Sequence, residues 1–132
     1  MYKRQYLHET LQEGGTLLVH MPLGDLLLDN SDRPVVLLSG GSGITPTLAM
    51  LDHLSSPTGG TRRVMFVHAA RNPEVMGFAE EIATMTKRRN GIEVILVLDQ
   101  DDSEVALPGT KIIGRISAGL LRQHLPLSLI HI

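Results

Sequence analysis

The chain of 132 residues contains no cysteine and no tryptophan. The lack of cysteine excludes disulfide bonds, thiol nucleophiles and cysteine-ligated metal clusters. Aromatic side chains are few, with two tyrosines and two phenylalanines, so stacking on bases or sugars is not an expected means of binding. What remains is an apolar chain with thirteen glycines.

Charge of neither sign dominates the sequence. Twelve Lys and Arg residues stand against fourteen Asp and Glu, which gives a formal net charge of -2, so a nucleic-acid partner is not expected. The apolar runs are too short to span a membrane, and no basic-then-apolar leader opens the chain. With 42% hydrophobic and 20% charged residues, the composition predicts a globular, cytoplasmic domain without a membrane partner.

Hydrophobic periodicity divides the chain into alternating strands and helices. Continuous apolar runs predict buried strands at residues 35–38, 63–68 and 92–98. Helical spacing predicts helices at residues 45–54 and 117–124, and another that opens at Asn72-Pro73 and ends at Asn90-Gly91. The buried stripe of that middle helix is expected to comprise Val75, Phe78, Ala79, Ile82 and Ala83. The alternation predicts an α/β fold with parallel strands and right-handed crossovers.

Weaker patterns flank these elements. Residues 16–20 and 26–28 read as two short strands near the N-terminus, and residues 100–110 read as a polar loop. No internal repeat and no low-complexity segment is visible in the sequence.

A glycine-rich loop follows the first buried strand and carries the binding chemistry. Glycine lets the backbone approach a ligand closely, and the helix that follows offers unpaired N–H groups to an anion, for which a pyrophosphate is the natural candidate. Thr45 is the expected N-cap, and Pro46 suits the first helical position. The loop departs from the usual dinucleotide fingerprint, since Pro46 stands where a third glycine belongs. A tight turn without a ligand is the alternative interpretation. The candidate loop residues are Gly40, Gly41, Ser42, Gly43, Ile44, Thr45 and Pro46.

Several segments together resemble the nicotinamide-binding half of the ferredoxin reductase family. Gly24-Asp25 precedes the first buried strand, the glycine loop follows it, and residues 68–72, His-Ala-Ala-Arg-Asn, end the next strand. Within that family the sequence is most similar to the C-terminal reductase region of flavohaemoglobins, which also shares Tyr-Leu-His-Glu at residues 6–9. The resemblance spans residues 6–126 and implies a parallel-sheet, Rossmann-like nucleotide-binding domain.

The resemblance implies an activity and its cofactors. NAD(P)H would lie across the strand ends and give hydride to FAD in a preceding β-barrel domain. In a flavohaemoglobin the electrons would pass on to haem in a globin domain, where nitric oxide and oxygen form nitrate. Residues 40–45 would hold the phosphates, Arg71 and Asn72 would approach the nucleotide, and Gly24 and Asp25 would lie at the domain junction. The alternatives are the reductase component of an oxygenase and a catalytically inactive nucleotide-binding fragment.

Departures from the family pattern predict a partial protein. The flavin motif Arg-x-Tyr-Ser and the nicotinamide motif Cys-Gly-Pro are both absent, and no globin portion is present. We therefore expect residues 1–30 to be a remnant of the FAD-binding barrel and residues 31–126 to be part of the NAD(P)-binding domain. No catalytic residue is assigned, and the chain alone is expected not to catalyse.

Both ends of the sequence match a sequencing adapter. One codon choice for residues 127–132, CTG TCT CTT ATA CAC ATC, is the transposase mosaic end, and its reverse complement encodes residues 1–5 if GTG is the start codon. We therefore expect both segments to be adapter-derived, and other codons in the DNA would contradict this.

The remaining polar residues have simpler interpretations. The six histidines lack the spacing of a metal site, and His68 is expected to be a hydrogen-bonded structural residue. Glu80-Glu81 and residues 87–89 complement the dipole of one helix and are expected on a solvated face. Asp99, Asp101 and Asp102 place negative charge after the third strand, which favours NADH over NADPH because NADPH carries an extra phosphate.

Overall fold

The computed structural model describes residues 3–21, 23–101 and 105–124. Its centre is a four-stranded parallel sheet in the order β1-β2-β3-β4. The strands are β1 (Val35–Gly40), β2 (Val64–Ala70), β3 (Ile92–Leu98) and β4 (Thr110–Ile113). The helices are α1 (Lys3–Glu9), α2 (Ile44–Ser55), α3 (Ala79–Arg88) and α4 (Ala118–His124), with 3-10 turns η1 (Gly41–Gly43) and η2 (Pro73–Val75).

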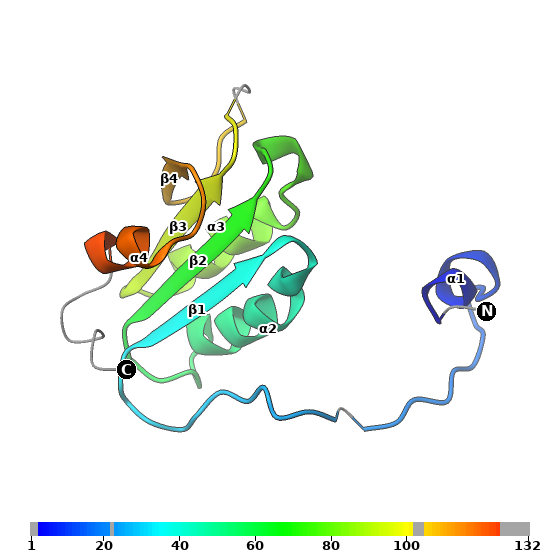
Figure 1. Ribbon diagram of the computed structural model, residues 1–132. Coiled ribbons are helices and arrows are strands. Elements are labelled where there is room, and N and C mark those ends of the chain that lie inside the picture. The colour runs from blue at the N-terminus through cyan, green and yellow to red at the C-terminus, as the bar shows by residue number, and fades with distance from the viewer. Residues whose placement is uncertain (1–2, 22, 102–104, 125–132) are drawn as a thin grey trace.

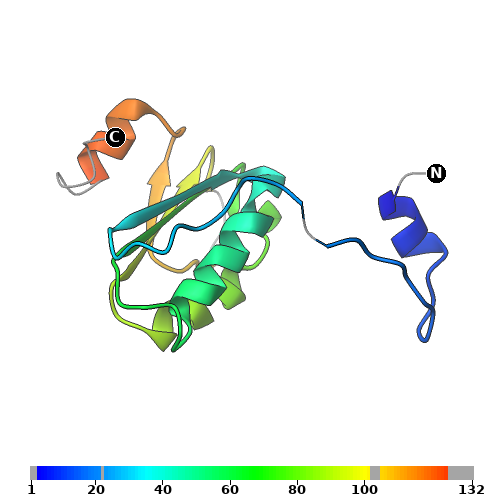
Figure 2. The ribbon, with the colours of Figure 1, turned by 90° about the horizontal axis from the view of Figure 1, so that it is seen from below.

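Helices cover both faces of the sheet, with α2 and α3 on one face and α4 on the other (Figures 1 and 2). The face beneath α2 and α3 holds the larger core, in which Phe66, Leu51 and Ile82 are fully buried. The opposite face holds a smaller cluster around Val67 and Val97, against which α4 packs. The predicted α/β fold with parallel strands is confirmed.

The three strands expected from apolar runs are confirmed, and the sheet contains a fourth. Ile95 pairs with Thr110 and Leu98 with Ile113, so β4 continues the parallel ladder. The loop expected at residues 100–110 therefore ends where this strand begins. The strand has only four residues, two of which are polar, which is too short for a period-two pattern to stand out.

The predicted helix from Asn72 onwards is wrong in its first half. The Asn72 side chain caps only the short turn η2 by accepting the N–H of Val75 at 3.1 Å. Phe78 then adopts φ +68°, in the left-handed region, where a right-handed helix cannot continue. The regular helix α3 therefore begins at Ala79, and Val75 and Phe78 are exposed instead of lying on a buried stripe.

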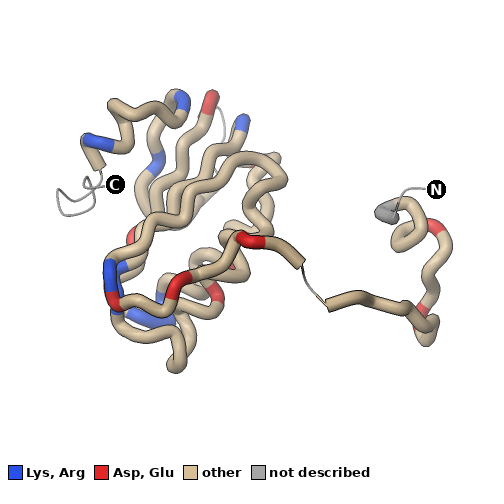
Figure 3. Tube along the Cα trace, turned by 60° about the horizontal axis from the view of Figure 1, so that its bottom comes forward, with Lys and Arg blue, Asp and Glu red and all other residues tan. Residues whose placement is uncertain are grey.

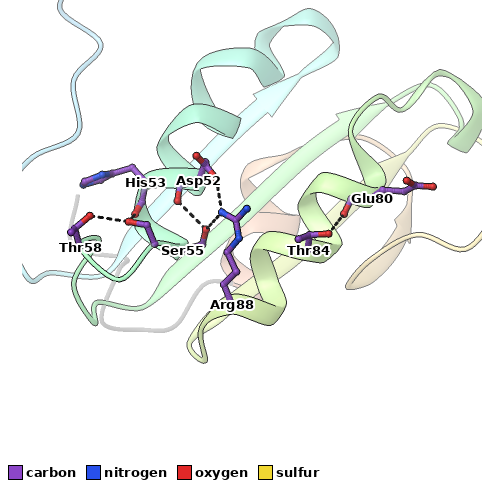
Figure 4. A network of polar contacts seen from close by, with 8 residues as sticks. Asp52, His53, Ser55, Thr58, Glu80, Thr84 and Arg88 are labelled. Carbon is purple, nitrogen blue, oxygen red and sulfur yellow. Dashed lines mark hydrogen bonds and ion pairs between the residues drawn. The ribbon is translucent and has the colours of Figure 1, made fainter.

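Helix α3 is joined to α2 by a polar network (Figure 4). The Arg88 guanidinium donates to the Asp52 carboxylate at 2.6 Å and lies 3.5 Å from the Ser55 hydroxyl. Glu80 and Glu81 lie in the first turn of α3, and Lys87 and Arg88 in the last, as the helix dipole favours. Arg88, which was expected only to lie on a solvated face, therefore also links α3 to α2.

The two short strands expected at residues 16–20 and 26–28 are wrong. The described residues between Leu11 and Asp29 form neither helix nor strand, and the chain instead begins with α1. This segment runs away from the sheet (Figures 1 and 2), and no neighbouring strand pairs with it among the described residues. Strands need such a partner for their N–H and C=O groups.

The extended segment joins the domain through a buried arginine. Arg62, 7% exposed, donates to the Asp29 carboxylate at 2.6 Å and to the Ser31 carbonyl at 2.9 Å. Arg89 in turn donates to the Arg62 carbonyl at 2.8 Å. The hydrogen bond from Arg62 is the main cause of a lowered pKa of Asp29. The adjacent Leu28 packs against the core, so the segment is attached from about this residue onwards.

Some expectations fall on residues outside the described part of the chain. These are the adapter interpretation of residues 1–2 and 127–132 and the charge of Asp102. Among the described residues, no helix is long and apolar enough to cross a membrane.

Candidate functional site

A cleft of about 800 Å³ lies at the carboxyl ends of the four strands. Ligands bind at this edge of open α/β sheets, because the loops after the strands converge there. Residues of both charge signs occur along these loops (Figure 3). The cleft is lined by Gly40, Gly41, Ser42, Ile44, His68, Ala69, Ala70, Arg71, Val75, Gly77, Phe78, Asp99, Gly114, Arg115 and Ile116.

The glycine loop forms one wall of this cleft. Strand β1 ends at Gly40, the turn η1 follows, and helix α2 begins at Ile44. Gly41 has φ +49°, a conformation that side-chain-bearing residues rarely adopt. A Cβ atom on Gly41 would meet no protein atom within 4 Å, so the backbone here is open to a ligand. The Ile44 N–H donates to the Gly41 carbonyl and Pro46 has no N–H. The other N–H groups in the first turn of α2 have no carbonyl partner within the helix, which suits an anion.

The expected roles of Thr45 and Pro46 in the loop are corrected by the structure. The N-cap of α2 is Gly43, which makes no side-chain hydrogen bond. Thr45 is the second residue of α2, and its hydroxyl donates back to the Ser42 carbonyl at 3.3 Å. Pro46 is the third helical residue, where its missing N–H is still not needed. Gly43, Thr45 and Pro46 do not line the cleft, whereas Gly40, Gly41, Ser42 and Ile44 do.

The loop after β2 forms the next part of the cleft. Arg71 is exposed and lines it. Asn72 does not line the cleft, because its side chain caps η2. Two backbone hydrogen bonds join the chain after β3 to the end of β2 and the loop that follows it. The Asp99 N–H donates to the Ala70 carbonyl at 3.3 Å, and the Gln100 N–H donates to the Arg71 carbonyl at 3.1 Å.

An apolar wall of the cleft and the segment after β4 were not predicted from the sequence. Val75, Gly77 and Phe78 line the cleft, with Val75 62% and Phe78 42% exposed. Their helical spacing suggested a buried stripe, although Gly77 within it was a signal of a break. The far side of the cleft is lined by Gly114, Arg115 and Ile116. These residues follow β4, the strand that the sequence did not predict.

The charges in and near the cleft are partly balanced. The Asp99 carboxylate lies 3.5 Å from the Arg115 guanidinium, and Asp101 pairs with Lys111 at 2.6 Å. Arg71 adds a further positive charge on the cleft. Two of the three aspartates expected to supply unbalanced negative charge therefore face cations.

His68 is hydrogen-bonded, as expected. Its Nδ1 atom lies 2.9 Å from the hydroxyl of Ser39 on the neighbouring strand, and its side chain is buried. Burial lowers the pKa of His68, so the imidazole is neutral at pH 7. Among the described residues, no group of three His, Cys, Asp or Glu side chains could hold a metal ion.

Comparison with known families identifies the class of protein to which this fold and cleft belong. Residues 37–132 match the oxidoreductase NAD-binding domain. Because the match covers most of the chain, the protein belongs to this family of NAD-binding oxidoreductase domains.

The sequence is also similar to flavohemoproteins. It is 42% identical over 124 residues to a flavohemoprotein of Deinococcus radiodurans, which covers 92% of the chain and 30% of that relative. A flavohemoprotein of Pseudomonas putida is 38% identical over 121 residues, 92% of the chain and 29% of the relative. The expected resemblance to flavohaemoglobins is confirmed, and the chain spans less than a third of these relatives' length.

Solved structures share the fold. The cytochrome b5 reductase domain of Ulva prolifera nitrate reductase has a TM-score of 0.54 at 17% identity, covering 70% of this chain and 33% of that one. A flavohemoglobin from Malassezia yamatoensis, with bound FAD and heme, has a TM-score of 0.52 at 21% identity, covering 68% and 27%. The fold is therefore that of ferredoxin reductase-like domains.

Proposed function

We propose that this chain is the NAD(P)H-binding part of an oxidoreductase that passes hydride from NAD(P)H to FAD. The parent protein is proposed to be a flavohaemoglobin-type nitric oxide dioxygenase, whose FAD-binding and globin domains precede this one. The observation that carries the proposal is the open glycine loop, which lies at the cleft between the end of β1 and the start of α2.

The residues of the cleft fit a dinucleotide. Its volume of about 800 Å³ lies in the range of small-molecule sites. Gly40 and Gly41 present bare backbone beside the start of α2, where a pyrophosphate would be stabilised by N–H groups and by the helix dipole. When bound, NAD(P)H supplies the hydride, and the groups of this chain bind and orient it.

The adenosine half is proposed to lie over the ends of β2 and β3. In Rossmann-like sites the ribose next to the pyrophosphate lies at the end of the second strand, which here carries Arg71. Phe78 and Val75 are exposed on the same cleft and offer an apolar wall to the adenine ring. Asn72 is then proposed to act indirectly, by capping the turn η2 that precedes this wall.

Calorimetric titration of the 132-residue chain tests the proposal. We expect saturable binding of NADH and of ADP-ribose, which shares its pyrophosphate and adenosine. Adenosine, which is the adenosine half of both ligands without the pyrophosphate, is the matched control and should bind far more weakly. Equal binding of all three ligands, or of none, would contradict the proposed role of the glycine loop.

The parent activity is tested by restoring the missing domains. A fusion in which residues 6–126 of this chain replace the matching segment of the Deinococcus radiodurans relative should give a yellow protein that oxidises NADH and converts nitric oxide and oxygen to nitrate. NADH oxidation through FAD without nitrate formation would instead favour the reductase component of an oxygenase. Dinucleotide binding without NADH oxidation in the fusion would favour the inactive nucleotide-binding fragment.

We expect NADH to bind more tightly than NADPH. The Asp99 carboxylate lines the cleft close to the proposed ribose position and would repel a 2′-phosphate, although Arg71 and Arg115 reduce this effect. Titration of both dinucleotides measures the preference. Asp99→Asn should raise the affinity for NADPH while leaving that for NADH nearly unchanged. Tighter binding of NADPH by the unaltered chain would refute the preference.

A further inference from the structure

Two polar side chains lie buried side by side at the carboxyl ends of β1 and β2. Ser39 is 9% and His68 2% exposed. They are register partners in the parallel ladder, and the Ser39 hydroxyl lies 2.9 Å from Nδ1 of His68. The pair therefore links the two strands through their side chains as well as through their backbones.

Stability alone gives no reason for a polar pair at this place. In the sheet, His68 pairs with Leu96 on β3. The centre of its ring lies 6.4 Å from that of Phe66. Leu96 and Phe66 are both fully buried. Burying a hydroxyl and an imidazole is unfavourable unless they are hydrogen-bonded, and replacing both partners by apolar groups of similar shape is close to neutral. Aliphatic side chains would therefore hold this part of the sheet equally well.

The position of the pair indicates a different role. Ser39 directly precedes Gly40, the last residue of β1 before the glycine loop, and His68 lies two residues before the end of β2, after which Arg71 begins the next loop. Both loops line the cleft. Gly40 and Gly41 have no side chains with which to attach the glycine loop to its neighbour. Among the described strands, β1 pairs with β2 alone, so this hydrogen bond is well placed to fix the two loops relative to each other.

We propose that Ser39 and His68 are positioning residues for dinucleotide binding, and that their hydrogen bond fixes the separation of the glycine loop from the loop after β2. The Ser39 hydroxyl donates to Nδ1 of His68 when the imidazole hydrogen is on Nε2, and accepts from Nδ1 when the hydrogen is there. The inference rests on the proposed function, because the two loops hold the phosphates and the adjoining ribose.

The test separates positioning from folding by replacing the pair with aliphatic residues. Ser39→Val combined with His68→Leu should leave the melting temperature unchanged or raise it, yet weaken NADH and ADP-ribose binding at least tenfold in calorimetric titration. Ser39→Ala should also weaken binding. His68→Asn, whose amide can replace Nδ1 either as acceptor or as donor, should retain most of the affinity of the unaltered chain. His53→Gln alters an exposed histidine at the other end of α2 and serves as the matched control.

The outcomes distinguish this inference from the proposed function. If the unaltered chain binds no dinucleotide, both are overturned. If it binds and the aliphatic pair retains full affinity, only the positioning role is overturned. If the double variant loses melting temperature together with its affinity for NADH, the hydrogen bond has only a structural role and the inference fails. Should the double variant not fold, Ser39→Ala decides, and unchanged affinity in that variant overturns the inference.

Discussion

At the scale of single residues, Gly41 is the position in the glycine loop where the backbone requires glycine. Its φ of +49° would cost a side-chain-bearing residue about 1–2 kcal/mol. Gly41→Val should therefore lower the free energy of unfolding by about this amount. It should also abolish NADH binding, since the new side chain would point into open space at the cleft.

Chemical denaturation and NADH titration measure the two effects of Gly41→Val. Gly43→Ala is the matched control, because Gly43 has φ −69° and does not line the cleft. NADH binding should change little in this control, whereas the free energy of unfolding should fall modestly because alanine is a poorer N-cap than glycine. Equal loss of binding in the two variants would show that the loop as a whole, rather than the conformation of Gly41, is sensitive to side chains.

The buried His68 makes stability depend on pH. Burial lowers its pKa below the ordinary value of 6.5. Below that pH the unfolded chain binds a proton that the folded chain binds only at more acidic pH. The free energy of unfolding should therefore be insensitive to His68 above about pH 7.5 and decrease as the pH falls below 6.5.

Melting temperatures recorded between about pH 7.5 and 5 test this dependence. His68→Leu should reduce the decline towards acidic pH, whereas His53→Gln, which changes an exposed side chain, should leave it unaltered. A decline of the same size in all three proteins would assign it to other groups.

At the scale of elements, Arg62 attaches the N-terminal segment to the sheet. Arg62→Met retains most of the buried volume but removes the hydrogen bonds to Asp29 and Ser31. We expect the segment before β1 to be released and its cleavage by trypsin at Arg33 to become severalfold faster. The matched control is Arg63→Met, which removes an exposed ion pair with Glu93. This variant keeps the cleavage site at Arg33. An exposed pair contributes little, and cleavage in this control should be unchanged.

The elements that the sequence predicted correctly are those with a strong local pattern. The run Ile92–Leu98 is apolar at nearly every position and became β3 with the same bounds. Strand β4 was missed, because Thr110 and its neighbours form a strand only by adding to the edge of β3. Conversely, residues 16–20 contain the short apolar run Leu-Leu-Val, which suits a strand, but they find no partner strand among the described residues. Pairing is a tertiary property that a local pattern does not contain.

The candidate site was predictable in part for the same reason. Gly40 ends β1 and Gly41 follows it, so the pattern of a buried strand running into glycines and a helix indicated both. Arg71, which directly follows β2, was expected at the nucleotide from the family resemblance. The wall around Phe78 was not predictable, because its spacing from Ile82 suited a buried helical stripe. The left-handed conformation of Phe78 ends that stripe and turns the side chain to partial exposure. Arg115 was missed together with the strand that precedes it.

At the scale of the whole molecule, β1 is an exposed edge of the sheet. Within the described residues it pairs on one side only, and Leu38 on it is 46% exposed. Such an apolar edge favours pairing with another chain. We expect the 132-residue chain to self-associate, with a sedimentation coefficient that rises with concentration.

Two leucine-to-lysine variants locate the contact. Leu38→Lys should shift the chain towards monomer, because a charged side chain on an edge strand opposes pairing. Leu27→Lys changes a leucine that is 80% exposed in the N-terminal segment and should have little effect. If Leu27→Lys alone dissociates the chain, the association occurs through that segment and the edge prediction is wrong.

The strand order has a consequence for how the sheet folds. Each described strand pairs with the strand that follows it in the sequence, from β1 to β4. Every pairing therefore closes a loop of moderate length, and no strand must wait for a distant segment before it finds a neighbour. Since folding rates fall as contacts become more distant in sequence, this topology favours growth of the sheet outwards from the predominantly apolar pair β2 and β3. We expect core substitutions in these two strands, such as Val67→Ala, to slow folding more than substitutions in β4, such as Ile112→Ala.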